Sequence, residues 1–224
     1  MPDADKDGVP DDDEIRIYKT DPNKADTDND GYSDWVELNN DFSPLVGGGT
    51  KLDEVDTDQD KLNDKQELSF KTDISNPDTD GDGYKDGDEV NNFFNPLSAE
   101  KIKLNKKIEI NIKKQELKYY LSDVLMGKFL ISSGARDTTP RGNFKILNKQ
   151  LKAWSSYGLW MPYWMAFAGE GRYGIHELPI WPNGYREGED HLGKPVSHGC
   201  VRLGIGAAEF MYNWSDVGTP VFIY

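Results

Sequence analysis

The only cysteine of this 224-residue chain lies in the segment Ser197-His198-Gly199-Cys200, two positions after a histidine. The other two histidines, His176 and His191, fall in the same stretch, between residues 176 and 200. A cysteine nucleophile needs a base within hydrogen-bond reach of its thiol and a further group that orients the base. In an extended segment, residues 198 and 200 would point to the same side, and Gly199 would let backbone or substrate approach closely. The spacing therefore predicts a thiol site.

Two other interpretations of these residues stay open from their spacing alone. Cys200 could be a small core residue, because free cysteine is usually buried. His176, His191, His198 and Cys200 could bind zinc, since imidazole and thiolate are zinc ligands, although no common zinc pattern has this spacing. The sequence around His191 is typical of a surface or lid histidine. The nearby aromatic residues fit a core, a pocket wall or a sugar-stacking surface; they are Trp154, Tyr157, Trp160, Tyr163, Trp164, Trp181 and Tyr185.

A second kind of chemistry repeats four times in the first hundred residues. Each copy is a twelve-residue loop with carboxylates at positions 1, 3, 5, 9 and 12, and three copies have glycine at position 6. Calcium takes six to eight oxygens at about 2.3–2.6 Å, so alternate aspartates, a carbonyl at position 7 and a bidentate glutamate at position 12 suit one ion. The predicted ligands, with the position-7 residue offering its backbone carbonyl, are Asp3, Asp5, Asp7, Val9, Asp11 and Glu14; Asp26, Asp28, Asp30, Tyr32, Asp34 and Glu37; Asp56, Asp58, Asp60, Leu62, Asp64 and Glu67; and Asp78, Asp80, Asp82, Tyr84, Asp86 and Glu89.

The third loop departs from this pattern because Lys61 replaces the glycine at position 6. Glycine adopts the positive φ of this sharp turn without strain, whereas lysine does so at a cost and adds a positive charge near the ion. We therefore expect the third loop to bind calcium most weakly.

The segments before the loops do not have the leading helix of an EF-hand. Thr20-Asp21-Pro22-Asn23 and Ser75-Asn76-Pro77 are typical of turns, and short helices are expected only after the loops, in 35–38 and 89–92. The loops pair into a longer repeat of about 52 residues, with a flexible glycine-rich joint near residues 46–52. A solvated acidic tail is the alternative, but a tail would not keep register across four copies.

Charge divides the chain into two expected domains, a calcium-repeat region over residues 1–100 and a second domain over residues 101–224. The first has 29 acidic and 9 basic residues, and the second has 11 and 17. Clustered carboxylates in the first exclude nucleic acid as its partner, because phosphate contacts need Lys and Arg. No run of eighteen apolar residues predicts a transmembrane segment, and the start of the chain lacks a signal peptide, so we expect a mature fragment.

Calcium is also expected to control folding and to indicate location. Without the ion, repelling carboxylates and sparse apolar residues do not offset the chain entropy, so folding should be linked to calcium. Extracellular modules of this kind bind calcium at about 10⁻⁴–10⁻³ M. That affinity would be useless in a calcium-poor cytosol, so we expect the protein outside the cytoplasm, in the cell envelope or cell wall or secreted.

The second half has the alternation of β-strands. Lys107 to Lys113 alternates apolar and polar residues. The segments 115–121 and 124–133 predict a hairpin that turns at Ser122-Asp123, 139–144 predicts a turn entering a strand, and 218–223 predicts a closing strand. Only Ala207 to Trp214 is typical of a helix.

Several ordered motifs give this half a family resemblance: Ser133-Gly134, Thr139 to Phe144, Met161 to Met165, Gly174-Ile175-His176, Ser197 to Leu203 and Gly218 to Val221. Together they resemble the YkuD-like L,D-transpeptidase catalytic domain, over about residues 106–224. The resemblance implies a mainly β domain of mixed sheets with one or two short helices. The acidic loops, over about residues 3–98, resemble bacterial thrombospondin type 3 and dockerin-like calcium repeats, which form a region of loops and short helices.

The resemblance to the transpeptidases assigns roles to individual residues. It implies Cys200 as nucleophile and His176 as general base, with His198 as a third residue of the catalytic set. Ser197, Gly199, Arg202 and Tyr173 would surround the substrate or the oxyanion, where donors must face the developing negative oxygen. The separation of His176 from Ser197 by residues 177–196 is longer than usual in the family, which predicts a lengthened lid.

The implied reaction is acyl transfer on peptidoglycan stem peptides, with no catalytic cofactor and with structural calcium in the repeats. Cys200 would release the terminal D-alanine of a tetrapeptide, hold a thioester and pass the acyl group to an amine of a neighbouring stem. The same thiol would be acylated by carbapenems. Two alternatives stay open: a carboxypeptidase or endopeptidase of the same fold, and a non-catalytic, calcium-dependent adhesion protein. A cell-wall or envelope protein is a further expected class of partner.

Overall fold

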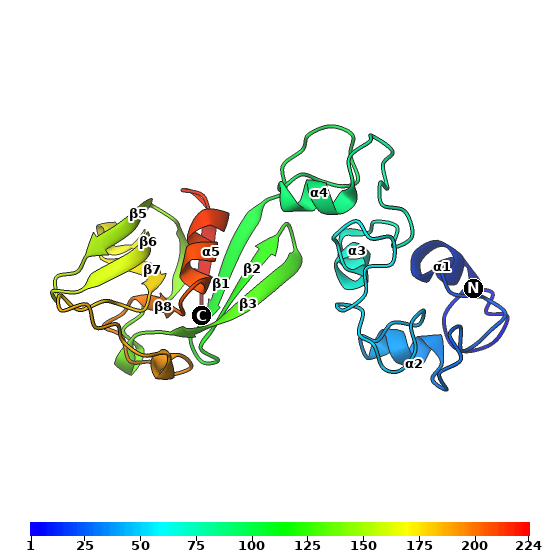
Figure 1. Cartoon of the computed structure of the whole chain (residues 1–224), viewed down its shortest axis with the longest axis horizontal. Helices are drawn as coiled ribbons and strands as arrows, with labels where there is room; N and C mark the ends of the chain where they lie inside the picture. Colours follow the sequence, from blue (N-terminus) through cyan, green and yellow to red (C-terminus); the bar gives the residue numbers. More distant parts are fainter. The chain divides into compact units, whose positions relative to one another are not determined.

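The computed structural model describes all 224 residues and contains two compact units, Met1–Leu104 and Asn105–Tyr224 (Figure 1). The division falls four residues after the one expected from charge. No helix in either unit has the length and apolar character needed to cross a membrane.

Every acidic loop of the first unit leads directly into a short helix. The helices are α1 (Asp11–Asp13), which continues as a π-helical turn over Glu14–Tyr18, α2 (Asp34–Asn39), α3 (Asp64–Phe70) and α4 (Asp86–Asn91). Each begins at the position-9 aspartate of its loop, which places the position-12 glutamate in the first or second turn. The expected unit of one loop and one short helix is confirmed.

Backbone geometry repeats from loop to loop. Position 4 has a positive φ in all four, at Lys6, Asn29, Gln59 and Gly81. Position 6 does as well, with φ of 110° at Gly8 and 84° at Lys61. The third loop therefore keeps the turn that glycine favours although it has lysine there, and the Lys61 ammonium contacts Asp88 at 3.0 Å.

The segment at Gly47–Gly49, expected to be a flexible joint, is attached to the second loop instead. The Gly48 N–H donates to Asp30 Oδ2 at 2.9 Å. A Cβ on Gly47 would lie 2.9 Å from the Asp30 Cβ, so this glycine permits a close approach to the loop. The apolar core of the unit is small and is formed by Val9, Leu52, Leu62, Phe70, Ile74 and Val90.

The second unit is built on one mixed sheet of nine strands, in the order β4-β9-β1-β2-β3-β8-β7-β6-β5. Two neighbouring pairs, β1 with β9 and β7 with β8, are parallel, and the others are antiparallel. The strands are β1 (Lys106–Asn111), β2 (Glu116–Leu121), β3 (Val124–Ser132), β4 (Gly142–Lys145), β5 (Asn148–Trp154), β6 (Trp160–Ala168), β7 (Tyr173–Glu177), β8 (Val201–Leu203) and β9 (Pro220–Ile223).

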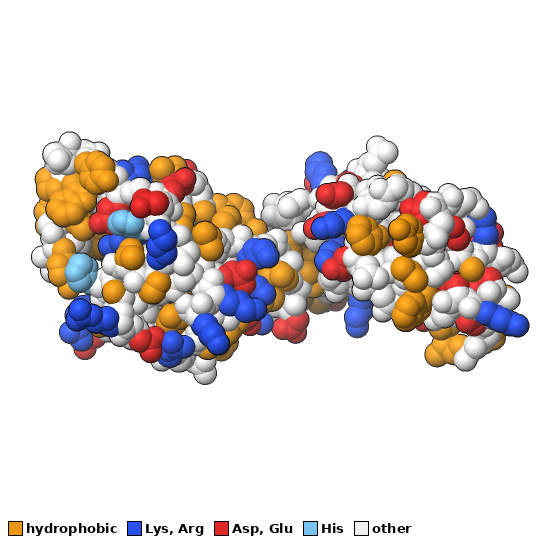
Figure 2. All heavy atoms as spheres, turned by 90° about the horizontal axis from the view of Figure 1, so that it is seen from below, with side chains coloured by type: hydrophobic (Ala, Val, Ile, Leu, Met, Phe, Trp, Pro, Cys, Tyr) orange, Lys and Arg blue, Asp and Glu red, His pale blue; other side chains and the backbone are white.

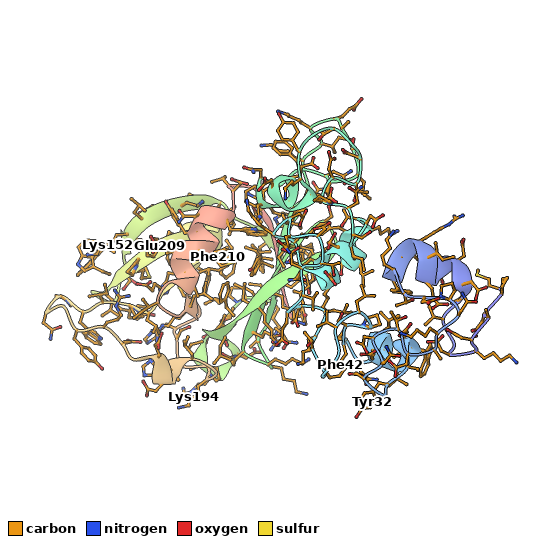
Figure 3. All side chains as sticks on the ribbon, turned by 45° about the vertical axis from the view of Figure 1, so that its right-hand side comes forward. Tyr32, Phe42, Lys152, Lys194, Glu209 and Phe210 are labelled. Carbon is orange, nitrogen blue, oxygen red and sulfur yellow. The ribbon has the colours of Figure 1, made fainter.

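The strands expected from alternation are confirmed in β1, in the β2–β3 hairpin, in β4 and in β9. Ile108, Ile110 and Ile112 are buried, as their spacing predicts. The single expected helix is α5, with the expected bounds Ala207–Trp214. It buries Ala208, Met211 and Trp214, while Glu209 and Phe210 project from it (Figure 3).

Aromatic contacts and a lysine fix α5 to the sheet. The ring centroids of Phe210 and Trp214 each lie 5.2 Å from that of Tyr119 on β2. Lys149 on β5 donates to the Tyr212 and Ser215 carbonyls, the second at 2.7 Å. A cation at the C-terminal end of a helix stabilises its unpaired carbonyls.

Candidate active site and candidate metal loops

The parallel pair β7–β8 brings the predicted base and nucleophile together. Ile175 pairs with Val201 and His176 with Arg202. Extending this register by one residue places Cys200 beside Gly174, two residues before His176 and therefore on the same side of the strand. Cys200 and His176 are far apart in the sequence, but they lie on or next to two adjacent, paired strands.

The segment from Ser197 to Cys200 is bent and not extended, so the extended geometry considered for residues 198 and 200 does not apply. The Ser197 hydroxyl donates to the Cys200 carbonyl at 2.5 Å and accepts from the Gly199 N–H at 3.0 Å. Gly199 has a φ of 127°, and a Cβ there would lie 2.6 Å from Tyr173 Cε1. Glycine is required at this position because both the conformation and the close contact exclude a side chain.

His176 is buried and held in one orientation. Its Nδ1 lies 2.5 Å from the Glu177 carbonyl oxygen. Because a carbonyl only accepts, Nδ1 carries the proton and Nε2 is left as the basic nitrogen. Burial lowers the pKa of His176 to about 3. The positive charge of Arg202 also lowers it, whereas the hydrogen bond to Glu177 raises it by less than burial lowers it. The imidazole is therefore neutral at physiological pH.

Cys200 borders both the apolar core and an open cavity. It packs against the core cluster of Ala153, Met161, Trp164 and Ala166, and its Sγ lies 4.0 Å from the Arg172 carbonyl oxygen. Burial raises the pKa of the thiol, although the Gly174 backbone and the Arg202 charge oppose the rise. The resting pair is thus a neutral thiol and a neutral imidazole, with no hydrogen bond between them. A thiol that faces a cavity is poorly described as a core residue.

The cavity has a volume of about 470 Å³, within the range of ligand sites. It contains two arginines, Arg172 and Arg202, and no carboxylate, so an anionic ligand would meet no repulsion inside. Its lining residues are Gln150, Ala153, Trp154, Ser155, Ser156, Tyr157, Leu159, Met161, Trp164, Gly171, Arg172, Tyr173, His176, Pro179, Ser197, His198, Cys200 and Arg202. All seven predicted catalytic and substrate residues lie on or beside this cavity, with Gly199 forming the turn behind it.

Arg202 is buried and joins the site to the long insertion over residues 177–196. Its Nη1 donates to Glu187 Oε2 at 2.5 Å, while its buried Nε has no partner. The residue just before Glu187 in the insertion, Arg186, pairs with Glu177, which follows His176 in the sequence. Two ion pairs therefore fasten the insertion to β7 and β8. Sequence reasoning missed Glu187 and Arg172, because no local pattern marks them.

The remaining histidines do not complete a zinc site. His191 is 3.2 Å from Glu187 Oε2 on the insertion and does not line the cavity. His198 lines the cavity but is stacked on Tyr157, with ring centroids 4.1 Å apart. Its place is the cavity wall, and it makes no hydrogen bond with Cys200.

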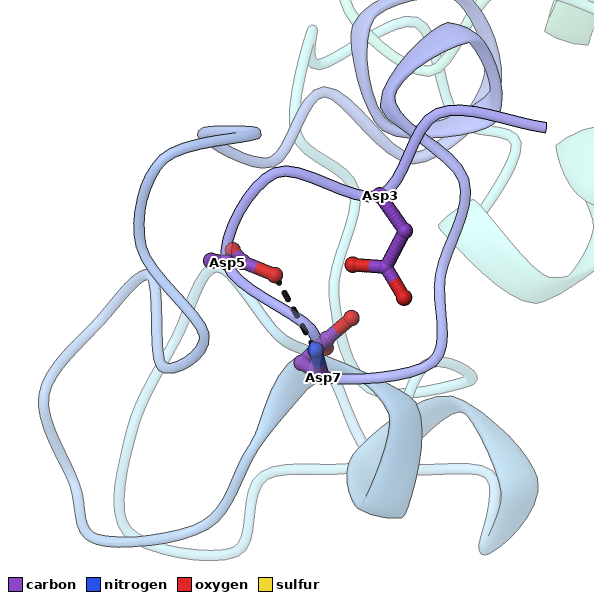
Figure 4. A group of neighbouring side chains, drawn as sticks. All are labelled: Asp3, Asp5 and Asp7. Atoms are coloured by element: carbon purple, nitrogen blue, oxygen red, sulfur yellow. Dashed lines mark hydrogen bonds between the residues drawn. The ribbon is translucent and has the colours of Figure 1, made fainter.

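The first three aspartates of each acidic loop point into one cluster. Carboxylate oxygens from positions 1, 3 and 5 lie within 4.8 Å of one another in all four loops. In the first loop the Asp7 N–H donates to Asp5 Oδ1 at 3.1 Å, and carboxylate oxygens of Asp5 and Asp7 lie close to one of Asp3 (Figure 4). Equivalent bonds recur at Asp30, Asp60 and Asp82.

Each loop also buries two carboxylate oxygens that have no hydrogen-bond partner, one at position 3 and one at position 12. Burial and the neighbouring aspartates raise the pKa of the position-12 glutamates, to about 8 for Glu37 and about 9 for Glu67. Unpaired buried oxygens are costly unless a cation neutralises them, so the residues fit a calcium ion. The unpaired oxygens are Asp5 Oδ2, Glu14 Oε2, Asp28 Oδ2, Glu37 Oε2, Asp58 Oδ2, Glu67 Oε2, Asp80 Oδ2 and Glu89 Oε2.

The position-9 aspartates close the loops. Both Asp34 oxygens accept from Thr27, from its N–H at 2.8 Å and its hydroxyl at 2.7 Å. Asp64 and Asp86 hold Thr57 and Thr79 in the same way, and Asp11 accepts from the Ala4 N–H. The structure does not place these four side chains in the clusters of positions 1, 3 and 5.

Comparisons with known proteins agree with this arrangement. The family model of the L,D-transpeptidase catalytic domain (YkuD) matches residues 105–223, just over half of the chain. The bacterial TSP3 repeat matches residues 3–25, 26–40 and 78–92, which contain the first, second and fourth loops. The third loop, with Lys61 at position 6, is outside these matches.

Individual relatives are more distant. The putative L,D-transpeptidase YciB of Bacillus subtilis is 27% identical over 124 residues, which are 52% of this chain and 64% of that protein. An L,D-transpeptidase from Mycobacterium smegmatis is 20% identical, with 57% and 64% of the two chains covered and a TM-score of 0.47. An L,D-transpeptidase from Xylanimonas cellulosilytica is 26% identical, with 54% of this chain and 61% of that chain covered and a TM-score of 0.44. The match over residues 105–223, together with the thiol and imidazole that its strands bring to one cavity, shows that this chain belongs to the L,D-transpeptidase (YkuD) family.

Proposed function

We propose that the protein is a cysteine-dependent peptidoglycan L,D-transpeptidase whose catalytic unit is carried on calcium-stabilised repeats. The observation that carries this proposal is the single cavity shared by the Cys200 thiol and the His176 imidazole, whose Nδ1 is occupied by the Glu177 carbonyl. A nucleophile, a base and a group that orients the base are the parts needed for thiol acyl transfer.

The neutral resting pair determines how the first step proceeds. Cys200 attacks the carbonyl between the diamino acid and the terminal D-alanine as its proton passes to His176 Nε2. The proton then passes to the leaving amine, D-alanine departs, and the acyl group is held as a thioester. An amine of a neighbouring stem attacks the thioester, forms the new amide bond and restores the thiol.

The oxyanion formed in each step needs donors already aimed at it. The Gly199 N–H donates to Ser197 Oγ and is therefore already paired. The Cys200 N–H, which the family resemblance implies as a donor, is proposed for this role. Gly199 acts instead through its backbone shape, which lets the turn lie against Tyr173.

The charges of the cavity support a stem peptide as the substrate. Stem peptides carry several carboxylates, and the cavity offers Arg172 and the unpaired Nε of Arg202 without any acidic side chain. His198, Tyr173 and Ser197 form the walls around the thiol. Carbapenems, which are also carboxylates with a reactive carbonyl, are expected to acylate the same Cys200.

The repeats are proposed to bind calcium through positions 1, 3, 5, 7 and 12. Calcium would neutralise the two unpaired oxygens that each loop buries. The affinity expected for such loops, about 10⁻⁴–10⁻³ M, suits a location outside the cytoplasm, where the peptidoglycan substrate also lies.

Product analysis by mass spectrometry tests the catalytic proposal. The full chain is incubated with a stem tetrapeptide, with and without an acceptor amine, beside its Cys200→Ala variant. A cross-linked product that requires Cys200 supports the transpeptidase. Free D-alanine without cross-links would indicate the hydrolase, and unchanged products in the variant would exclude the thiol mechanism. Binding without any product would indicate the adhesion protein.

A further inference from the structure

The turn between β5 and β6 places exposed aromatic rings at the mouth of the Cys200 cavity. Trp154 is 53% exposed and Tyr157 is 61% exposed, and both line the cavity with Ser155 and Ser156. We call residues 154–157 the aromatic rim. Figure 2 shows hydrophobic side chains gathered at one end of the catalytic unit.

The rings of the aromatic rim are held in place although they are exposed. Trp154 packs edge-on against Trp160, with ring centroids 4.6 Å apart. Tyr157 has one face on His198, so its other face is open. Ser155 fixes the turn, because its hydroxyl accepts from the Tyr157 N–H at 3.1 Å and its N–H donates to the Leu159 carbonyl at 2.9 Å. Rings that are already ordered lose little entropy when a ligand stacks on them.

The charge at the aromatic rim differs from the charge inside the cavity. No residue between 153 and 169 is charged, in a chain in which 29% of residues are charged. The cavity interior, in contrast, presents Arg172 and Arg202. A ligand that fits both parts would have an anionic portion inside and an uncharged portion with flat apolar faces at the mouth.

Peptidoglycan has this division, since its anionic stem peptide is attached to a glycan strand. In the proposed reaction the acylated carbonyl belongs to the third residue of the stem. Three extended α-linked residues span about 11 Å, and a stem peptide is only slightly longer, so the sugar lies near the mouth when the carbonyl reaches Cys200. Pyranose rings present C–H faces that pack on aromatic rings, with hydroxyls left for groups such as Ser155 and Ser156.

We infer that the aromatic rim binds the sugar to which the donor stem is attached, so that the enzyme selects stems on glycan over free peptides. This inference rests on the proposed function and adds a glycan subsite to it. Trp154 and Tyr157 supply the stacking faces.

The test compares two donor substrates, a tetrapeptide attached to its N-acetylglucosamine–N-acetylmuramic acid disaccharide and the same tetrapeptide without sugar. The wild type should have about a tenfold higher kcat/KM for the disaccharide form, mainly through a lower KM. Trp154→Ala should bring this ratio close to one, and Trp154→Phe should restore part of it. Tyr185→Ala is the matched control: Tyr185 is 62% exposed but does not line the cavity, so the ratio should stay.

The inference is overturned if the wild type uses both substrates equally, or if Trp154→Ala keeps the full ratio. Calorimetric binding of both ligands to the Cys200→Ala variant gives the same comparison without turnover. If neither substrate releases D-alanine but the disaccharide form still binds more tightly through Trp154, the proposed reaction fails and the glycan subsite stands. Equal binding of the two ligands excludes the subsite.

Discussion

The two units bury polar groups in opposite ways. In the catalytic unit, buried polar side chains such as Gln115, Ser133 and Ser197 have protein partners, and only the Nε of Arg202 is left unpaired. In the repeat unit, every loop buries two carboxylate oxygens without a partner. The catalytic unit is stabilised by an apolar core and internal hydrogen bonds, whereas we propose that the repeat unit depends on calcium to neutralise these oxygens.

Removing calcium should give the largest difference between the two units. In calorimetry of the full chain, a chelator should abolish the unfolding transition of the repeat unit and leave that of the catalytic unit in place. The reason is that eight buried oxygens lose their neutralising ions. Calcium returned at millimolar concentration should restore the transition. A repeat unit that melts at the same temperature with chelator would contradict the calcium sites.

Gly199→Ala should lower the stability and the acylation rate of the catalytic unit and leave the repeat unit unchanged. The added Cβ would lie 2.6 Å from Tyr173 and 3.0 Å from the Thr138 carbonyl oxygen, at a φ of 127°. We expect Gly199→Ala to lower the stability of this unit by about 2 kcal/mol and to slow acylation of Cys200 by a carbapenem at least about tenfold. Mass spectrometry follows the acylation.

Gly218→Ala is the control for this substitution. Gly218 also has a positive φ, 99°, but its Cβ would meet no atom within 4 Å. It should therefore lose about 1 kcal/mol from backbone strain and keep the rate of acylation. If both variants are acylated at the wild-type rate, the close packing of the Ser197–Cys200 turn has no part in the reaction.

The pH dependence of thiol alkylation should reveal the neutral resting pair. Since burial raises the pKa of Cys200, the neutral thiol persists to higher pH, and alkylation by iodoacetamide should rise through a midpoint above the ordinary value of 9.0. His176, with its pKa lowered to about 3, stays uncharged over this range and adds no step between pH 5 and 8. The denatured chain, with its thiol in water, is the reference. A native midpoint below that of the denatured chain would instead indicate a preformed thiolate and imidazolium pair.

The smallest expected effect concerns Lys61. Its positive φ costs a non-glycine residue about 1 kcal/mol, while its exposed ion pair with Asp88 is worth no more than about 1 kcal/mol. Lys61→Gly should therefore strengthen calcium binding by the third loop up to a few-fold, measured by titration calorimetry. Lys61→Asn, which removes the charge and tolerates the left-handed turn, should act in the same direction. Unchanged affinity in both variants would show that Lys61 does not weaken the loop.

Local patterns in the sequence predicted much of this molecule because the interactions concerned are local. Alternation predicted β1 and the β2–β3 hairpin, and helical spacing predicted α5 to the residue. The loop spacing predicted the convergence of the aspartates at positions 1, 3 and 5, since those residues are neighbours along one turn of the chain. The same spacing could not show that three of the four position-9 aspartates accept hydrogen bonds from threonines and the fourth, Asp11, from the Ala4 N–H.

The active site was predictable in its members but not in its geometry. The family resemblance named Cys200 and His176 as the candidate thiol and base, yet only the structure shows the bend of the Ser197–Cys200 segment. No feature of residues 177–196 predicted that Glu187 would pair with Arg202. Such a pair depends on where two distant segments meet, and the sequence of either segment is compatible with many partners.

By itself, the sequence determined the carboxylate spacing of the four loops, the division into an acidic and a mildly basic part, and a single thiol two positions after a histidine. Those properties follow from residue type and short-range spacing. The tertiary structure decided which nitrogen of His176 is free, that the Gly174 backbone lies against the thiol, and which aromatic rings stay exposed at the cavity mouth. These depend on the parallel pairing of β7 with β8 and on the turn between β5 and β6, and long-range packing fixes both.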